Sequence, residues 1–153
     1  MLVRVQGKNP ILIAEDDAND AEMVRLALVK AGISNPAHLV TDGSDVIAYL
    51  KAEGPYSDRE QFPFPRLLLL DLKMPGMDGL QVLEWLDSHP ECSIIPTIIM
   101  SASSIDTDVK RAYQLGASSY FVKPLRFEDL VRMFRLVCEY WETCALPKLP
   151  LKC

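Results

Sequence analysis

The chain is organised around one stretch, Leu67-Leu68-Leu69-Leu70-Asp71-Leu72-Lys73-Met74-Pro75-Gly76-Met77-Asp78-Gly79. Four leucines in succession are typical of a strand that is buried on both faces of a parallel sheet. The run stops at Asp71, and Pro75, Gly76 and Gly79 then predict a tight loop before the next helix. In open α/β folds, ligands bind at the carboxyl ends of strands, so Asp71 is a candidate site residue. Asp71 alone is also compatible with a solvated strand end, and the other segments decide between the two.

Short apolar runs and helical periodicity alternate along the rest of the chain. We expect strands at residues 11–14, 37–41, 67–71, 97–100 and 119–122, and helices at about 19–31, 44–53, 80–88, 106–115 and 127–144. A repeated strand–helix unit implies parallel strands with right-handed, helix-covered crossovers. The predicted fold class is therefore α/β, a doubly wound five-stranded parallel sheet. We expect residues 1–153 to form a single domain, with its core at about 10–144 and a short tail at 145–153.

Composition narrows the class of protein. Of the 153 residues 49% are hydrophobic, and the net charge of −5 without a basic run argues against a protein that binds nucleic acid through its phosphates. The apolar runs are too short to span a bilayer and residues 1–10 lack the pattern of a signal peptide, so we expect a cytoplasmic protein that is not membrane-bound. The cysteines form no CxxC pair; they are Cys92, Cys138, Cys144 and Cys153. In a reducing compartment we expect all of them to remain thiols rather than to bind zinc.

Residues 54–65 break the alternation with a long connection that contains three prolines. Connections in α/β units are usually only a few residues long. Two interpretations remain open for this loop. It is either a tolerated surface insertion or a partner contact anchored by Tyr56, Phe62 and Phe64.

Polar side chains stand at the ends of the predicted strands. Glu15 and Asp16 follow the first strand, and the third, fourth and fifth end at Asp71, Ser101 and Lys123. Parallel strands bring these residues to one edge of the sheet. Three carboxylates a few ångströms apart repel by roughly 4 kcal/mol per pair at an effective dielectric of about 20, so cations must balance them. Lys123 supplies one charge, and an all-oxygen site of this kind suits Mg²⁺ or Mn²⁺.

Carboxylates, a divalent metal ion, a lysine and a hydroxyl are the groups that phosphoryl transfer requires. A carboxylate can act as the nucleophile and form an aspartyl phosphate, while its neighbours neutralise the charge of the transferred group. Asp71 is the expected nucleophile and phosphoacceptor, and Glu15 and Asp16 are the expected metal-binding acids. The groups expected to bind the phosphoryl oxygens are Lys123, the Ser101 hydroxyl and the Ala102 backbone N–H.

Four segments, taken in order, form a specific pattern. They are Ile11-Leu12-Ile13-Ala14-Glu15-Asp16, the part of the quoted stretch from Leu69 to Gly79, Ile98-Ile99-Met100-Ser101-Ala102, and Gly116-Ala117-Ser118-Ser119-Tyr120-Phe121-Val122-Lys123-Pro124. With them the sequence resembles the receiver domains of response regulators, which have a flavodoxin-like fold, from residue 10 to about 138. The resemblance implies the roles given above and adds the Lys73 backbone carbonyl as a metal ligand and Tyr120 as a switch aromatic. On phosphorylation, Ser101 is expected to move inward and Tyr120 to turn from solvent toward the core.

The same resemblance implies a place in a two-component system. The chain is expected to accept a phosphoryl group from a sensor histidine kinase and to catalyse its own phosphorylation and dephosphorylation, rather than to act as an enzyme on a separate substrate. The loop at 54–65 and the long final helix resemble the small regulators that accompany bacterial and cyanobacterial phytochromes. A bacteriophytochrome-like kinase is therefore the implied partner, and output is expected through protein contact or onward phosphotransfer.

Two alternatives share the chemistry or the fold. Phosphohydrolases of the haloacid-dehalogenase type carry a second Asp two residues after the nucleophile, a position that Lys73 occupies here. A receiver-fold adaptor that acts without phosphorylation would be expected to lack one of the acids or the lysine, and all are present. Phosphotransfer is therefore the preferred interpretation.

Two structural details follow from it. We expect a cis peptide bond before Pro124, because the chain must turn so that the Lys123 ammonium faces Asp71. In the final helix we expect an inner stripe of Leu130, Phe134, Val137 and Trp141.

A second apolar set lies largely off that stripe and consists of Phe127, Val131, Leu136, Tyr140 and Leu146. An exposed apolar patch is typical of an interface. We expect a homodimer in which this patch meets its own copy across a two-fold axis. The alternative is that several of these residues pack on the fourth helix or under the tail.

Overall fold

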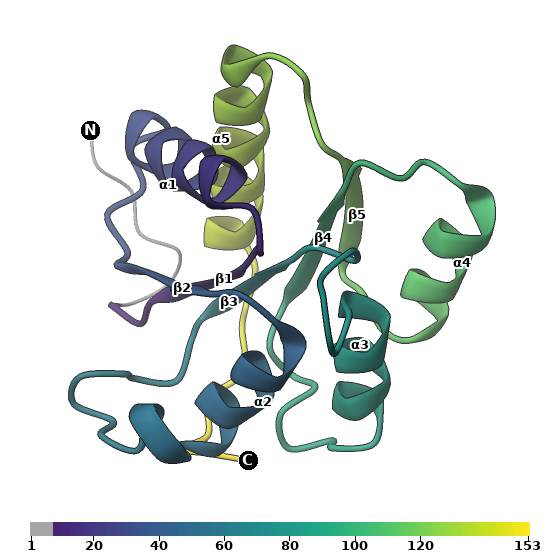
Figure 1. Ribbon diagram of the computed structural model, residues 1–153. Coiled ribbons are helices and arrows are strands. Elements are labelled where there is room, and N and C mark those ends of the chain that lie inside the picture. Colours follow the sequence, from purple (N-terminus) through teal and green to yellow (C-terminus); the bar gives the residue numbers. More distant parts are fainter. Residues whose placement is uncertain (1–7) are drawn as a thin grey trace.

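The computed structural model describes residues 8–153. Within them, a five-stranded parallel sheet runs through the middle of the molecule (Figure 1) in the order β2-β1-β3-β4-β5. Its strands are β1 (Ile11–Ala14), β2 (Ala37–Val40), β3 (Leu67–Leu70), β4 (Thr97–Ser101) and β5 (Ser119–Val122). The chain builds outward from β1 to β2 and then crosses back to β3, so the predicted doubly wound sheet is confirmed.

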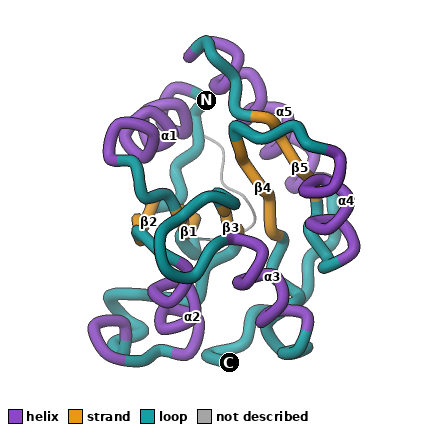
Figure 2. Tube along the Cα trace, turned by 45° about the vertical axis from the view of Figure 1, so that its right-hand side comes forward, coloured by secondary structure: helices purple, strands orange, loops and turns teal. Residues whose placement is uncertain are grey.

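Helices cover both faces of the sheet. α1 (Ala18–Lys30) and α5 (Phe127–Thr143) pack together on one face. The other face carries α2 (Gly43–Lys51), α3 (Gly79–Asp87) and α4 (Asp106–Gln114), and a 3₁₀ helix, η1 (Gly54–Tyr56), follows α2. Figure 2 shows the strands, in orange, between these two layers. None of the helices in residues 8–153 has the length and apolarity needed to cross a lipid bilayer.

The leucines of β3 contribute to two separate cores. Because side chains alternate along a strand, Leu67 and Leu69 pack with α1 and α5, whereas Leu68 and Leu70 pack with the α2–α4 layer. All four are buried. Each stabilises the fold by about 1.5–3 kcal/mol relative to an exposed leucine. The unbroken apolar run is thus explained by burial on both faces of a central strand.

The α5 helix presents a broad apolar face to the sheet. Leu130, Phe134 and Val137 are buried as predicted, and Trp141 packs against the edge of the same core. Val131 is only 5% exposed, so its assignment to an exposed patch was wrong. The physical reason is that α1 packs against this side of α5 and covers it.

The aromatic rings of residues 54–65 face into the molecule. Phe64 is buried, and Tyr56 and Phe62 pack against the same core with their ring centroids 5.4 Å apart. The buried Tyr49 holds the loop, because its hydroxyl donates a hydrogen bond of 2.9 Å to the Pro63 carbonyl. This packing supports the interpretation of the loop as a surface insertion, since the three rings are used to hold the loop on the core.

The last residues correct the cysteine prediction. Cys92 and Cys153 are 61 positions apart and form a disulfide, with their Cα atoms 5.7 Å apart. Cys138 and Cys144 remain thiols. Spacing along the sequence did not predict the pair, because residues 145–153 return from α5 to the far side of the sheet before Cys153 meets Cys92.

Candidate functional site

The register of the parallel strands determines which residues meet at the carboxyl edge of the sheet. Ala14 of β1 pairs with Leu70 of β3, and the Asp71 N–H donates a hydrogen bond of 3.1 Å to the Ala14 carbonyl. On the other side, the Lys123 N–H donates a hydrogen bond of 2.8 Å to the Ser101 carbonyl. The residues at the ends of β1, β3, β4 and β5 therefore lie along one edge, as predicted.

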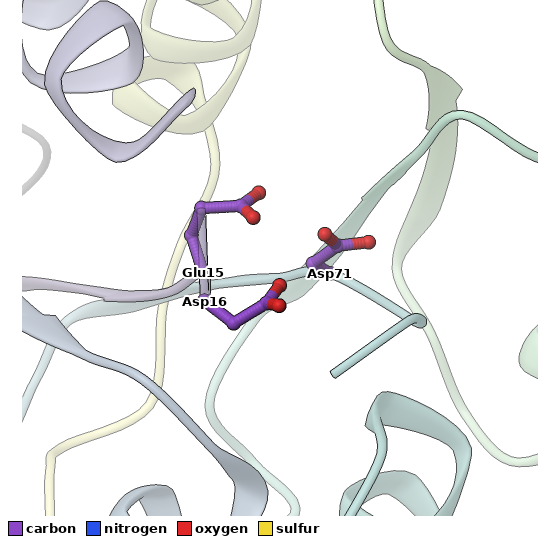
Figure 3. A group of neighbouring side chains, drawn as sticks. All are labelled: Glu15, Asp16 and Asp71. Carbon is purple, nitrogen blue, oxygen red and sulfur yellow. The ribbon is translucent and has the colours of Figure 1, made fainter. Parts of the chain in front are cut away.

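Three carboxylates come together at this edge. Oxygens of Glu15, Asp16 and Asp71 lie within 4.8 Å of one another, and Figure 3 shows the first two side chains turned toward Asp71. Glu15 and Asp71 are buried, whereas Asp16 is exposed. An all-oxygen set with one open side fits a small divalent cation that keeps several water ligands, such as Mg²⁺ or Mn²⁺.

The Lys123 ammonium balances part of this negative charge. Its Nζ lies 2.6 Å from Glu15 Oε2, 3.0 Å from Asp71 Oδ2 and 3.1 Å from Asp20 Oδ2. Burial opposes the charge on the lysine, but the hydrogen bonds and charges of Glu15 and Asp71 outweigh it and raise the pKa of Lys123. The lysine therefore stays protonated at neutral pH and holds the ends of β1 and β3 together.

The pKa of Glu15 shows most clearly the effect of placing buried carboxyl groups close together. Burial raises the pKa of Glu15 to about 7 and the charge of Asp71 adds to the rise, against the lowering by hydrogen bonds from Lys123 and the Asp17 backbone. Its charged form is therefore disfavoured unless more positive charge approaches. A buried carboxyl group of this kind is typical of a metal or catalytic site.

The peptide bond between Lys123 and Pro124 is trans, and no cis peptide bond occurs in residues 8–153. The prediction of a cis bond was therefore wrong. The long, flexible side chain of Lys123 reaches Glu15 and Asp71 from the end of β5, so the backbone does not have to reverse there.

Ser101 and Tyr120 are connected through the loop after β4. Ser101 is fully buried, and its Oγ accepts a hydrogen bond of 3.1 Å from the Ser103 N–H. The Tyr120 hydroxyl donates a hydrogen bond of 2.8 Å to the Ser103 carbonyl, and its ring lies half-buried against the core. Ala102, between the two serines, is exposed. These contacts connect the Tyr120 ring to the loop that follows Ser101.

Lys73 contacts the site through its backbone. Its N–H donates a hydrogen bond of 3.2 Å to Asp71 Oδ1, which orients the carboxylate. Its ammonium lies 3.6 Å from Asp108 Oδ2 of α4, with the lysine side chain largely exposed. An ion pair of this kind contributes about 1 kcal/mol or less.

One acid that contacts the site was missed by sequence reasoning. Asp20 contacts Lys123, and its spacing of four residues from Asp16 at a predicted helix start was the available signal. Asp17 and Asp78 cap α1 and α3 with side-chain hydrogen bonds that are 2.9 Å long. Each cap is worth about 1 kcal/mol and fixes a helix start beside the site.

Replacement of Lys123 by Met is expected to destabilise the metal-free protein by about 3 kcal/mol, because it leaves two buried acids without their cation. Chemical denaturation at neutral pH with a chelator present measures the change. Lys110→Met is the matched control, since Lys110 is exposed on α4, and its effect should stay within about 0.5 kcal/mol. If both variants are equally stable, the ammonium does not offset the repulsion.

The sequence comparison covers most of the chain. Residues 11–135 match the response regulator receiver domain family. The chain is 33% identical over 138 residues to Response regulator Rcp1 of Synechocystis sp. (strain ATCC 27184 / PCC 6803 / Kazusa), which covers 90% of this chain and 92% of Rcp1.

Solved structures agree with this over nearly the whole length. The crystal structure of response regulator RPA3017 in red light signaling of R. palustris has a TM-score of 0.86 at 30% identity and covers 92% of this chain and 99% of that one. The phosphorylated cyanobacterial phytochrome response regulator RcpA has a TM-score of 0.83 at 30% identity, with 93% and 100% covered. The Mn(2+)-bound form of Rcp1 has a TM-score of 0.79 at 32% identity, with 92% and 99% covered. With its five-stranded sheet and its edge of acids, this chain belongs to the response regulator receiver domain family.

Proposed function

We propose that this receiver domain accepts a phosphoryl group on Asp71 from a sensor histidine kinase and thereby switches a protein-interaction surface. The observation that carries the proposal is the contact of the Lys123 ammonium with both Glu15 and Asp71, beside the exposed carboxylate of Asp16. A nucleophile, a pair of metal-binding acids and a fixed cation thus share one edge of the sheet. Membership of the receiver family supports the same chemistry.

The nucleophile is held ready by its neighbours. The Lys73 N–H and the Lys123 ammonium bind one oxygen each of the Asp71 carboxylate. An Asp71 oxygen attacks the phosphorus of the phosphohistidine, the P–O bond forms as the P–N bond breaks, and the histidine keeps the electron pair. Water attack on the aspartyl phosphate reverses the modification. Both steps use groups of this chain, so the domain catalyses its own phosphorylation and dephosphorylation.

The acids at this edge fit a divalent ion, Mg²⁺ or Mn²⁺. The groups that would hold it are the carboxylates of Glu15, Asp16 and Asp71 and the backbone carbonyl of Lys73. When bound, the ion supplies positive charge for the phosphoryl oxygens. The Mn(2+)-bound form of Rcp1, a relative of similar fold, supports this assignment.

The loop after β4 is proposed to report phosphorylation. The phosphoryl oxygens bind Lys123, and the Ser101 hydroxyl and the Ala102 N–H bind the same group, which draws Ser101 toward the site. Tyr120 then occupies the space beside it and keeps the loop in place through the Ser103 carbonyl. The phosphoryl group shifts the equilibrium between the two arrangements of Ser101 and Tyr120 only by as much as it binds the inner arrangement more tightly than the outer one.

The kinase partner is proposed to be phytochrome-like, and the protein to act in the cytoplasm. RPA3017 is described in red light signaling and RcpA as a phytochrome response regulator, and both are similar in fold over more than nine-tenths of this chain. Residues 1–153 are proposed to act as one receiver unit, with the core at about 10–144 and the tail at 145–153. Output then goes through contact with a target protein or onward phosphotransfer rather than through nucleic acid.

A second surface is proposed to join two copies of the chain. Leu136 and Tyr140 are 58% and 63% exposed on α5, and with Trp141 they line a hollow of about 360 Å³ beside β5. Phe127 and Leu146 are half-buried, so they contribute less. One patch on one helix meets its own copy across a two-fold axis, which suits a symmetric homodimer.

The two alternatives have less support. Lys73 stands where a phosphohydrolase of the haloacid-dehalogenase type carries its second acid, and its ammonium pairs with Asp108. An adaptor that is never phosphorylated would have no use for the carboxylates buried against Lys123.

Incubation with a small phosphodonor and Mg²⁺ is expected to add one phosphoryl group to the chain. Asp71→Asn should abolish the gain, because an amide oxygen is a poor nucleophile. Intact-mass spectrometry measures both, and Asp87→Asn, an exposed position on α3, is the control that should still gain the group. Stoichiometric uptake by the Asp71→Asn protein would identify another nucleophile, and no uptake by the unaltered chain would favour the adaptor.

Asp16→Asn or Glu15→Gln is expected to weaken Mg²⁺ binding about tenfold or more, because each removes a charged ligand. An ion that binds the folded state raises the Tm, so the Mg²⁺ concentration that gives half of the Tm shift measures affinity. Asp87→Asn again serves as the control. If the Asp16→Asn protein keeps the affinity of the unaltered chain, Asp16 is not a ligand.

The chain is expected to be a dimer at tens of micromolar, and Tyr140→Asp is expected to make it a monomer by placing a charge in the contact. Light scattering measures the mass. Val29→Asp is the matched control, since Val29 is 61% exposed on a different helix, α1. If the unaltered chain is monomeric both when phosphorylated and when unphosphorylated, the dimer is refuted, because an interface of normal size should hold at this concentration.

A further inference from the structure

Residues 145–153, called the strap below, return from the end of α5 to the side of the sheet covered by α2 and η1 (Figure 1, yellow). The strap contains neither helix nor strand. Arg59 and Arg66 donate hydrogen bonds of 2.8 and 3.1 Å to its backbone carbonyls. The Cys153 N–H donates a hydrogen bond of 3.1 Å to the Leu50 carbonyl. The strap is thus held at separate points rather than by regular structure.

The disulfide attaches the strap covalently to the domain. Cys92 lies in the connection between α3 and β4, where it is fully buried in the core of that layer. Leu149 and Cys153 are partly buried and pack against the same core from outside. The Cα separation of 5.7 Å is within the range in which a disulfide forms without backbone movement. Oxidation of this pair therefore closes the strap over the core.

The noncovalent contacts of the strap contribute little free energy compared with the entropy lost when the strap is fixed in place. A hydrogen bond to a backbone carbonyl adds little net free energy in water, whereas every residue fixed in place loses backbone entropy. The disulfide changes this balance because it restricts the unfolded or undocked strap. When it is reduced, the end of the strap is free to leave.

We propose that Cys92 and Cys153 form a reversible redox site that fastens the strap when oxidised and releases it when reduced. The partly exposed Cys153 thiolate attacks a low-molecular-weight disulfide and displaces one thiolate. The Cys92 thiolate then attacks the Cys153 sulfur of this mixed disulfide and displaces the second small thiolate. The protein gives up two electrons and two protons, and the small disulfide becomes two thiols. A dithiol reductant reverses both exchanges.

This redox site has a role distinct from phosphotransfer, and it lies apart from Asp71. Cys92 precedes β4, whereas Asp71 follows the neighbouring strand β3. Because these strands are parallel, the two residues lie toward opposite ends of the strands. In the reducing compartment proposed above, disulfides are usually transient and respond to oxidants, which is the behaviour expected of this pair. The strap continues directly from α5, so its release frees the end of the helix that carries Tyr140.

Thiol mapping on the full chain tests the pairing. After equilibration with oxidised glutathione, denaturation and digestion without reductant, mass spectrometry is expected to recover Cys92 and Cys153 as one linked peptide pair. Treatment with dithiothreitol should make both available for alkylation, and renewed oxidation should restore the same pair. Recovery of Cys92 and Cys153 as separate alkylated peptides after oxidation, or linked to other cysteines, would overturn the proposal.

Hydrogen exchange of residues 145–153 tests the release. Reduction is expected to raise exchange of the Cys153 N–H, which the oxidised strap holds on the Leu50 carbonyl, about tenfold or more. It is also expected to lower the Tm by roughly 5 to 15 °C, because a closed loop of this length is opened. Cys153→Ser, which leaves the buried Cys92 in place, should behave like the reduced chain under both conditions. Cys144→Ser is the matched control and should respond like the unaltered chain. Equal exchange of the strap in the oxidised and reduced chains would overturn the proposal, whatever the phosphoryl uptake at Asp71.

Discussion

The carboxyl edge of the sheet depends on the contact of the Lys123 ammonium with Glu15 and Asp71. Buried carboxylates repel one another strongly where water is scarce, and a cation from a different strand is needed to hold them together. Lys123 reaches them across β4, the strand that separates β5 from β3 in the sheet. Loss of the lysine alone would leave two buried acids without their cation, so the three groups depend on one another, as is typical of a functional site.

The positions of these groups were predictable because parallel strands leave little freedom. Once the apolar runs are recognised as buried strands, the residues that follow them must gather at one edge, and Glu15, Asp71 and Lys123 do. Asp20 was less visible, since its contact depends on how α1 begins beside the sheet. The cis bond at Pro124 was wrongly predicted because a flexible lysine side chain can turn where the backbone does not.

The packing of segments that are distant in the sequence could not be predicted from the sequence pattern. Helical periodicity places Val131 off the inner stripe of α5, but the position of α1 decides that it is covered. The rings of Tyr56 and Phe62 were equally compatible with a partner contact until the loop was seen folded onto Tyr49. The path of residues 145–153 is a further case, because a segment without regular structure carries no periodic signal of where it docks.

The α5 helix links the two ends of the molecule. It begins four residues after Lys123, and it ends where the strap begins. Leu136 and Tyr140 lie between these points on its exposed side. A helix moves largely as a rigid element, so a change at either end acts on the same surface. If dimerisation and the state of the disulfide both depend on the position of α5, linkage requires the coupling to be reciprocal: reduction must then change dimer affinity by the factor by which dimerisation changes the thiol–disulfide equilibrium.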